Sequence, residues 1–200
     1  ASIMTTLVPS ATLLNIKVLD NEGNTQISTI MKGVQIAEQE GADFINISVG
    51  EMRDDCPENH PLTILINKLA EKGIMTVCSA GNSGPQRSPH IPASCKNTVA
   101  VGSINIRGRT NAWSSKGPSC GEKYPDCVSY GDEIVGALPG NQYGSLSGSS
   151  QATPQVTALL ALMKEATRRT FKRDEIELFL SESCNYIESM DKNNSSGWDR

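Results

Sequence analysis

A serine at position 150 has neighbours that suit a nucleophile. Ser150 follows Gly148 and Ser149 and precedes Ala152, so small residues leave space for another backbone to approach its hydroxyl. A helix is predicted to begin near Ser149, with Pro154 in its first turn, where a missing amide is tolerated. The positive end of that helix would stabilise negative charge developing beside the hydroxyl. The same residues also fit a plain helix cap at Ser149 or Ser150.

An asparagine in a glycine-rich loop is the second candidate group. Asn82 lies in the sequence SAGNSG at 79–84, directly after a predicted strand. In an open parallel sheet, ligands bind beyond the carboxyl ends of the strands, where this loop and the turn at 49–51 are both expected. The side-chain amide of Asn82 could donate to an oxyanion there. A simple turn asparagine is the alternative.

The elements that must position these groups follow from the hydrophobic pattern. Apolar runs of strand length alternate with segments of helical periodicity, and short strands are expected from 106 to 147. The predicted strands cover 15–20, 43–50, 73–81 and 97–105, and the predicted helices cover 25–41, 60–73, a stretch from about 149 and 173–184. This alternation predicts an α/β fold with a doubly wound, mostly parallel sheet and helices on both faces.

Length, charge and composition exclude several classes of function. The 200 residues carry a net charge of −4, contain 38% hydrophobic residues and include no apolar run near the length of a membrane span. Neither nucleic-acid binding nor a transmembrane segment is therefore expected. A nucleotide-binding module is also disfavoured, because no G-x-G-x-x-G follows a strand and the stretch 144–152 lacks the Gly-Lys-Ser/Thr end of a P-loop.

The six cysteines are too sparse for a disulfide scaffold and include no C-x-x-C pair, so no metal centre is expected. Cys120 and Cys127 flank a polar stretch, where a bridge and two free thiols fit equally well. Cys78, inside an apolar run, is predicted to be a small buried side chain.

Four ordered blocks resemble the subtilisin-like serine proteases, the subtilases of peptidase family S8, over nearly the whole chain. The blocks are VPSATLLNIKVLD, GADFINISVG, SAGNSG followed by a Pro-Ala step and NTVAVGSIN, and GSSQATPQV. The resemblance implies that Ser150 is the nucleophile, at the serine of the family's G-T-S-x-A-x-P motif. It implies that Asn82 is the side-chain oxyanion donor, paired with the backbone N–H of Ser150.

The resemblance also implies a substrate-binding pocket. One wall would be an extended edge to which a peptide adds as a strand, formed by Ser48, Val49 and Gly50. The opposite wall would be formed by Ser79, Ala80 and Gly81. Aligning the Pro-Ala step at 92–93 puts His90 near the pocket floor, where it would disfavour bulky side chains. A surface-loop histidine is the alternative.

Part of the family's catalytic machinery is not in this sequence. No Asp precedes a Ser/Thr-Gly step, no H-G-T-x-V-A block is present, and the two histidines, His60 and His90, lie in other contexts. The opening ASIM is similar to the continuation of the helix that follows the family's histidine, and SGWDR stops before a Gly-rich closing strand. We therefore expect residues 1–200 to be a partial catalytic domain whose Asp and His lie on a preceding segment, and expect this chain alone to be inactive.

The function implied by the resemblance is that of a serine endopeptidase that forms an acyl-enzyme on Ser150. A non-catalytic relative that only binds peptides is the alternative. The implied partners are a peptide or protein substrate and, as an open question, a propeptide; a secreted location is favoured. No cofactor is implied, because the connection from Ala1 to Val8 is too short for the Asn-rich insertion with which many relatives bind calcium. One departure from the family lies in the helix after the serine, where the usual Ser-Pro-His-Val-Ala-Gly is replaced by TPQVTA at 153–158.

Overall fold

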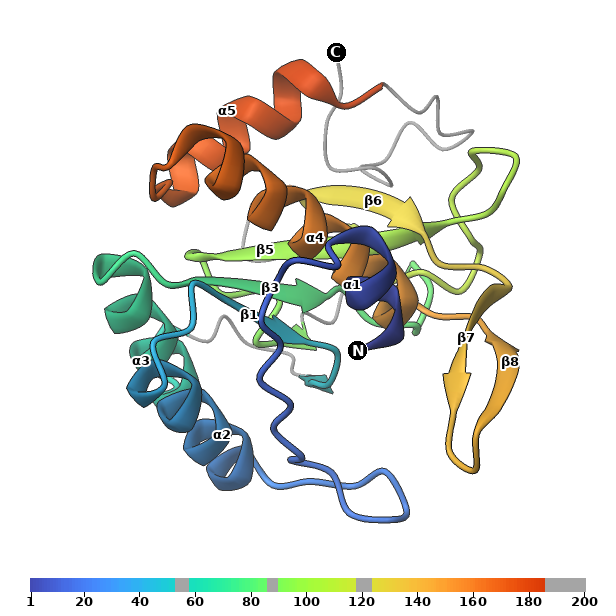
Figure 1. The fold of residues 1–200 in the computed structure, drawn as a ribbon, viewed down its shortest axis with the longest axis horizontal. Helices are drawn as coiled ribbons and strands as arrows, with labels where there is room; N and C mark the ends of the chain where they lie inside the picture. Colours follow the sequence, from blue (N-terminus) through green and yellow to red (C-terminus); the bar gives the residue numbers. More distant parts are fainter. Residues whose placement is uncertain (53–57, 86–89, 118–123, 186–200) are drawn as a thin grey trace.

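A four-stranded parallel sheet lies at the centre of the chain (Figure 1). The computed structural model describes residues 1–52, 58–85, 90–117 and 124–185. The strand order is β1 (Phe44–Ile47), β3 (Met75–Ser79), β5 (Thr98–Ile104) and β6 (Cys127–Tyr130). The register pairs Ile47 with Cys78 and Ser79 with Val101, so the carboxyl ends of these strands meet at one edge. The predicted strands at 43–50, 73–81 and 97–105 are confirmed.

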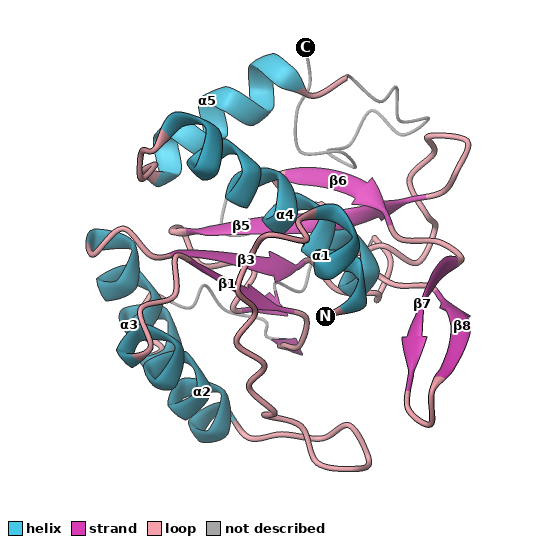
Figure 2. Cartoon of the chain, in the orientation of Figure 1, coloured by secondary structure: helices cyan, strands magenta, loops and turns pink. Residues whose placement is uncertain are grey.

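Helices cover both faces of this sheet (Figure 2). One face carries α2 (Ile27–Gln39) and α3 (Pro61–Glu71), and the other carries α4 (Ser149–Thr167) and α5 (Arg173–Ser183). A short helix, α1 (Ser2–Leu7), contacts α4. The doubly wound α/β architecture predicted from the sequence is confirmed.

The two helical layers enclose two hydrophobic cores, one on each side of the sheet. Alternate residues of β3 point to opposite faces, so Val77 packs in the core beneath α4 and α5, and Cys78 packs in the core beneath α2 and α3. Every residue of β5 is buried. Burial on both faces explains why these strands are continuous apolar runs. It also confirms the prediction for Cys78, whose thiol is free and fully buried and has its pKa raised by that burial.

Smaller strand pairs complete the fold. Strand β2 (Glu51–Met52) pairs antiparallel with β4 (His90–Ile91), directly after the carboxyl end of β1. Strands β7 (Ile134–Leu138) and β8 (Gln142–Leu146) form a hairpin that leads into α4. The short strands expected between 106 and 147 are present as β6, β7 and β8. Cys127 is a free buried thiol, and Cys120 lies outside the described residues.

The predicted strand at 15–20 is wrong. These residues belong to no strand, although Ile16 and Val18 place their side chains against Gly33 of α2, as the apolar pattern requires. A strand needs a neighbouring strand for its backbone hydrogen bonds. Strand β1 is the edge of the sheet on this side, and its only strand partner in the described part of the chain is β3. The apolar pattern therefore predicted packing correctly and pairing incorrectly.

Arg173 connects α5 to the amino-terminal ends of β5 and β6. Its Nε donates to the carbonyl of Thr98 at 2.6 Å, and its guanidinium pairs with Asp126, whose second oxygen accepts from the amide of Ala100 at 2.6 Å. Burial raises the pKa of the Asp126 carboxyl, and the Arg173 charge opposes that rise. An unpaired carboxylate would therefore be costly at this position.

We expect Arg173→Leu to lower the free energy of unfolding by about 3 kcal/mol near pH 8. Without the guanidinium, the pKa of Asp126 in the folded state rises further above its unfolded value. The folded variant then takes up a proton as the pH falls, so the loss of stability should shrink toward pH 5. Urea unfolding of both proteins at the two pH values measures this. Arg169→Leu is the control: it removes an exposed ion pair with Glu175 and should lower the free energy of unfolding by under about 1 kcal/mol. An equal loss of stability in both variants at both pH values would contradict this explanation.

Candidate active site

Ser150 lies at the start of α4, beside the carboxyl end of β1. The helix begins at Ser149 with Gly148 as its N-cap, and Ser150 is half-buried. Two hydrogen bonds of 3.3 Å join it to Ser48: the Ser150 hydroxyl donates to the Ser48 carbonyl, and the Ser48 hydroxyl donates to the Ser150 carbonyl. Residues 102 positions apart in the sequence are thereby held together.

Pro154 lies deeper in the helix than the sequence predicted. Because α4 begins at Ser149, Pro154 is inside the helix and not in its first turn. A helical amide at this position would donate to the carbonyl of Ser150, and proline has no N–H to do so. The Ser48 hydroxyl supplies the partner that this carbonyl lacks.

The side chain of Asn82 is oriented by Ser149. Its Oδ1 accepts from both the backbone N–H and the hydroxyl of Ser149, each at 2.9 Å, and the Ser149 hydroxyl in turn accepts from the amide of Gly81 at 3.1 Å. Because only the oxygen of the amide can accept hydrogen bonds, these two donors identify the oxygen and leave the nitrogen, Nδ2, on the other side. Asn82 Nδ2 is therefore free to donate elsewhere. Local sequence indicates Ser149 only as an alternative helix cap and carries no signal for this orienting role.

Two N–H groups and a side-chain oxygen surround the point where a Gly148 side chain would begin. A Cβ on Gly148 would lie 3.3 Å from Asn82 Nδ2, 3.6 Å from Ser150 N and 2.8 Å from Gln151 Oε1. Gly148 is buried and has no side chain of its own at this point, where the flexible Gln151 side chain is the nearest neighbour. The side-chain nitrogen of Asn82 and the backbone nitrogen of Ser150 therefore approach one point next to Gly148. Such a pair of N–H donors can stabilise an oxygen that becomes negatively charged during a reaction.

The predicted pocket walls lie side by side. Residues 48–50 continue from β1 and residues 79–81 end β3, which is the strand paired with β1. His90 reaches the second wall: a Cβ on Gly81 would lie 2.5 Å from the His90 Nε2, and the same nitrogen is 3.3 Å from the hydroxyl of Ser115. Burial lowers the pKa of His90, which favours the neutral imidazole.

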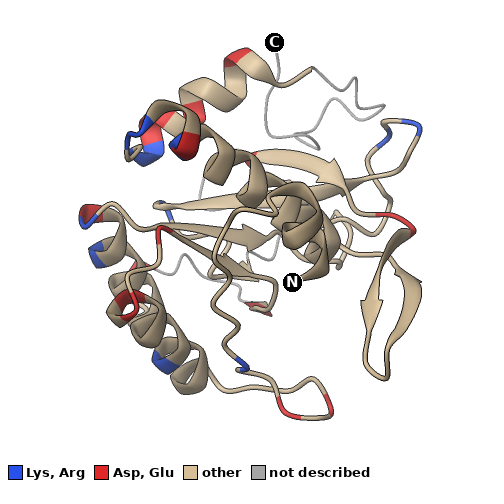
Figure 3. Ribbon diagram, viewed as in Figure 1, with Lys and Arg blue, Asp and Glu red and all other residues tan. Residues whose placement is uncertain are grey.

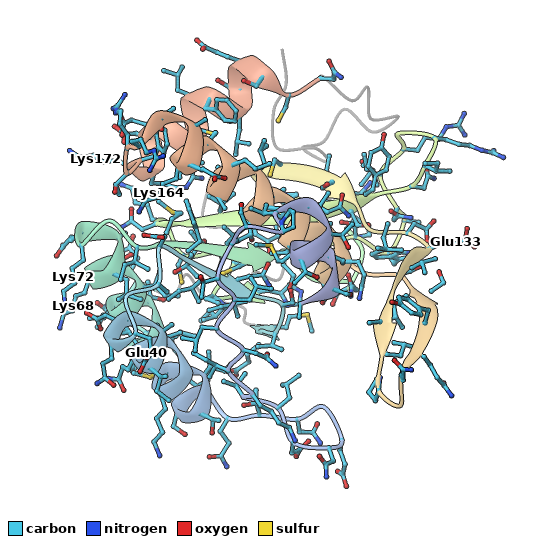
Figure 4. All side chains as sticks on the ribbon, viewed as in Figure 1. Glu40, Lys68, Lys72, Glu133, Lys164 and Lys172 are labelled. Carbon is cyan, nitrogen blue, oxygen red and sulfur yellow. The ribbon has the colours of Figure 1, made fainter. Side chains whose placement is uncertain are left out.

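The electrostatics favour negative charge at the start of α4. The helix has 19 residues and no acidic residue in its own first turn, and the positive end of its dipole faces this region. Figure 3 shows charged residues concentrated on α2, α3, the C-terminal part of α4 and α5. Lys72, Lys164 and Lys172 lie together on the side of the molecule where α4 ends, away from Ser150 at its start (Figure 4).

A protein-family model matches nearly the whole chain. The model of the subtilase family, described as peptidase S8, matches residues 1–199. The chain belongs to the subtilase family. The resemblance drawn from the four sequence blocks is confirmed.

Curated relatives of this subtilase are serine proteases. It is 33% identical to an intracellular serine protease of Paenibacillus polymyxa, over 86% of this chain and 51% of that protein. It is 33% identical to the major intracellular serine protease of Bacillus subtilis (strain 168), over 86% of this chain and 54% of that protein. Subtilisin E of the same organism is 34% identical over 78% of this chain and 40% of its own length. The chain thus spans about half the length of these relatives.

Solved structures show the same fold. The self-cleaved protease domain of PatA matches this subtilase with a TM-score of 0.73 and 27% identity, over 84% of this chain and 64% of that chain. A lanthipeptide protease matches with a TM-score of 0.82 over 98% of this chain and 69% of that chain, and at 21% identity this match concerns the fold alone.

Neither histidine of this subtilase is hydrogen-bonded to Ser150. His60 caps α3, where its Nδ1 accepts from the amide of Leu62 at 3.2 Å, and His90 contacts Ser115. Among the described residues, no three His, Cys, Asp or Glu side chains gather as a metal-binding group. No helix in those same ranges has the length and apolarity needed to cross a membrane.

Proposed function

We propose that this chain carries the nucleophile and the oxyanion site of a serine endopeptidase. Family membership and the serine protease relatives support peptide-bond hydrolysis. The observation that carries the assignment of residues is the convergence of Asn82 Nδ2 and Ser150 N on the space beside Gly148. A plain turn asparagine needs no buried serine to hold its carbonyl oxygen. The arrangement favours a donor kept ready for a reacting oxygen.

The reaction would proceed through an ester on Ser150. As Ser150 Oγ attacks the carbonyl carbon of the peptide, its proton passes to a general base, and the carbonyl oxygen becomes an oxyanion. The oxyanion accepts hydrogen bonds from Asn82 Nδ2 and Ser150 N–H. It then re-forms the carbonyl as the base protonates the departing amine. Water, deprotonated by the same base, attacks the ester and releases the acid.

We propose that neither histidine of this chain is the general base. Both histidines of this chain have other hydrogen-bond partners, His60 in the cap of α3 and His90 at Ser115. The Ser150 hydroxyl donates to the Ser48 carbonyl, which cannot act as a base at neutral pH. We propose that a segment outside this chain supplies the histidine and the aspartate that orients it. Relatives about twice as long are consistent with that proposal.

The substrate would bind as a strand added to residues 48–50. Val49 is half-buried, whereas Gly50 is exposed and lies so close to the Ile91 carbonyl that a Cβ would approach its oxygen to 2.7 Å. An extended peptide would pair with the partly exposed edge at 48–50 by backbone hydrogen bonds. The segment 79–81 would form the opposite side of the pocket for the residue before the scissile bond.

Peptide hydrolysis by the full-length protein that contains this chain tests the proposal. Wild type should hydrolyse an unstructured protein substrate, and Ser150→Ala should lose activity by several orders of magnitude. Binding of a non-cleaved peptide should survive in Ser150→Ala. Binding without hydrolysis in wild type would instead favour a non-catalytic peptide-binding subtilase, the alternative consistent with a serine whose hydroxyl contacts a carbonyl.

His90→Gly is expected to widen the range of residues accepted before the scissile bond. The imidazole abuts Gly81, so its removal should enlarge the space next to the wall at 79–81. We expect kcat/KM for peptides with Phe before the bond to rise about tenfold relative to the same peptides with Ala, the change expected from about 1.4 kcal/mol of added apolar contact. A matched pair of peptides assayed with both proteins measures this. An unchanged Phe to Ala ratio would show that His90 is a structural residue outside the pocket.

A further inference from the structure

A chain of side-chain hydrogen bonds links the middle of α4 to the backbone of Ser150. Thr157 Oγ1 donates to Asn46 Oδ1 at 3.0 Å, and Asn46 Nδ2 donates to Ser48 Oγ at 3.2 Å. Ser48 Oγ then donates to the Ser150 carbonyl at 3.3 Å. The chain begins and ends on α4 and passes through the edge strand β1, which α4 contacts.

Pro154 makes the hydrogen bond from the Ser48 hydroxyl to the Ser150 carbonyl important for this carbonyl. The Ser150 carbonyl lacks the usual donor four residues further along the helix, because Pro154 has no N–H, and the Ser48 hydroxyl donates to it instead. A hydroxyl has one hydrogen and can point it in several directions. With Asn46 Nδ2 donating to the Ser48 oxygen, the Ser48 hydrogen is directed at Ser150. Asn46 therefore determines the direction in which the Ser48 hydroxyl donates its hydrogen bond.

Thr157 determines in turn how the amide of Asn46 is turned. Asn46 is exposed on the edge strand, so solvent competes for its side chain. Thr157 is 3% exposed, and its hydroxyl hydrogen is shared between Asn46 Oδ1 and the Thr153 carbonyl at 3.1 Å. A donor on the α4 side holds Oδ1 toward the helix and leaves Nδ2 toward Ser48. A valine at 157 would have the same shape and no such preference.

We propose that Thr157 and Asn46 are positioning residues that act on Ser150 through Ser48. This proposal rests on the proposed function, because it treats Ser150 as the nucleophile. The same residue, Ser48, belongs to the edge proposed to bind the peptide, so the chain of hydrogen bonds fixes the nucleophile relative to the substrate strand. Neither Thr157 nor Asn46 needs to touch the substrate. Small displacements of a reacting group lower the rate more than they weaken binding.

Kinetics of the full-length protein test the proposal. Thr157→Val should lower kcat and the rate of serine labelling by a fluorophosphonate about 5- to 10-fold, the effect of losing about one hydrogen bond, with KM nearly unchanged. Thr157→Ser keeps the hydroxyl and should restore the wild-type rate. Asn46→Ala should match Thr157→Val, and the double variant should be no slower than either, because both act through the same contact. Thr167→Val is the control, because its hydroxyl donates to the Met163 carbonyl and accepts from the Arg169 amide at the far end of α4, away from Ser150.

The outcomes separate this proposal from the function on which it rests. Wild-type rates in Thr157→Val and Asn46→Ala would overturn the positioning role while leaving the protease intact. Should wild type itself fail to react, the proposed function falls, and amide hydrogen exchange still decides the positioning role. Exchange at 148–152 should then rise at least about threefold in Thr157→Val and stay unchanged in Thr167→Val. Equal exchange in these variants would overturn the proposal independently of activity.

Discussion

Replacing Asn82 by aspartate is expected to slow acylation of Ser150 by about 100- to 1000-fold, the range typical for loss of one oxyanion donor. That range was established on a subtilisin, so it is a family value. The aspartate keeps the oxygen that accepts from the N–H and hydroxyl of Ser149. It replaces the free amide nitrogen by an oxygen that carries negative charge. The fold should therefore survive while the site repels the charge it must stabilise.

The rate of labelling by a fluorophosphonate and kcat for a peptide measure this effect. Asn105→Asp is the matched control, because Asn105 Oδ1 likewise accepts two hydrogen bonds, here from the backbone amides of Arg107 at 3.0 Å and Arg109 at 3.1 Å. It lies in a turn after β5, and its variant should react at the wild-type rate. A folded Asn82→Asp protein that reacts as fast as wild type would show that Asn82 does not stabilise the oxyanion.

Replacing Gly148 by alanine is expected to have an effect of similar size, at least about 100-fold, by filling the space in which the oxyanion would lie. The added methyl group would lie 3.3 Å from Asn82 Nδ2 and 2.8 Å from Gln151 Oε1. Gly148 has an extended φ of 163°, which an alanine can adopt, so the expected loss comes from occupancy and not from backbone strain. Gln151 is a flexible side chain and can turn away, which leaves the helix intact.

Labelling rates and the midpoint of thermal unfolding, measured together, separate occupancy from misfolding. Gly148→Ala should lose labelling with a small change in the unfolding midpoint. Gly136→Ala in β7 is the control, because its added methyl would meet only the hydroxyl of Ser2, at 3.0 Å. Labelling of Gly148→Ala at the wild-type rate would place the oxyanion elsewhere and remove the main support for the site.

The fold was predictable wherever packing alone decides it. The apolar runs at 43–50, 73–81 and 97–105 became strands because each has a neighbouring strand and a helical layer on each face. The run at 15–20 alternates apolar with polar residues, and its Ile16 and Val18 pack on α2 as expected. It forms no strand, because pairing depends on a neighbour that local sequence does not reveal.

The sequence indicated the residues proposed for the site and not the contacts that orient them. The motif around Ser150 and the loop of Asn82 identified the two groups, and the structure brings them together through Ser149. Hydrogen bonds between distant residues, such as Thr157 to Asn46 across 111 positions, have no local signal. The one available clue was the departure from the family pattern at Thr157. The position of Pro154 was mistaken because the start of a helix is poorly defined by sequence alone.

Mapping the site of fluorophosphonate attachment in the full-length protein tests the central claim most directly. Such a probe reacts with a serine whose hydroxyl is activated and whose neighbours can stabilise the charged intermediate. Digestion and mass spectrometry of the labelled protein should find the phosphonate on Ser150, and Ser150→Ala should not be labelled. Attachment to another serine, or no attachment to a demonstrably folded protein, would contradict the assignment of Ser150 as the nucleophile.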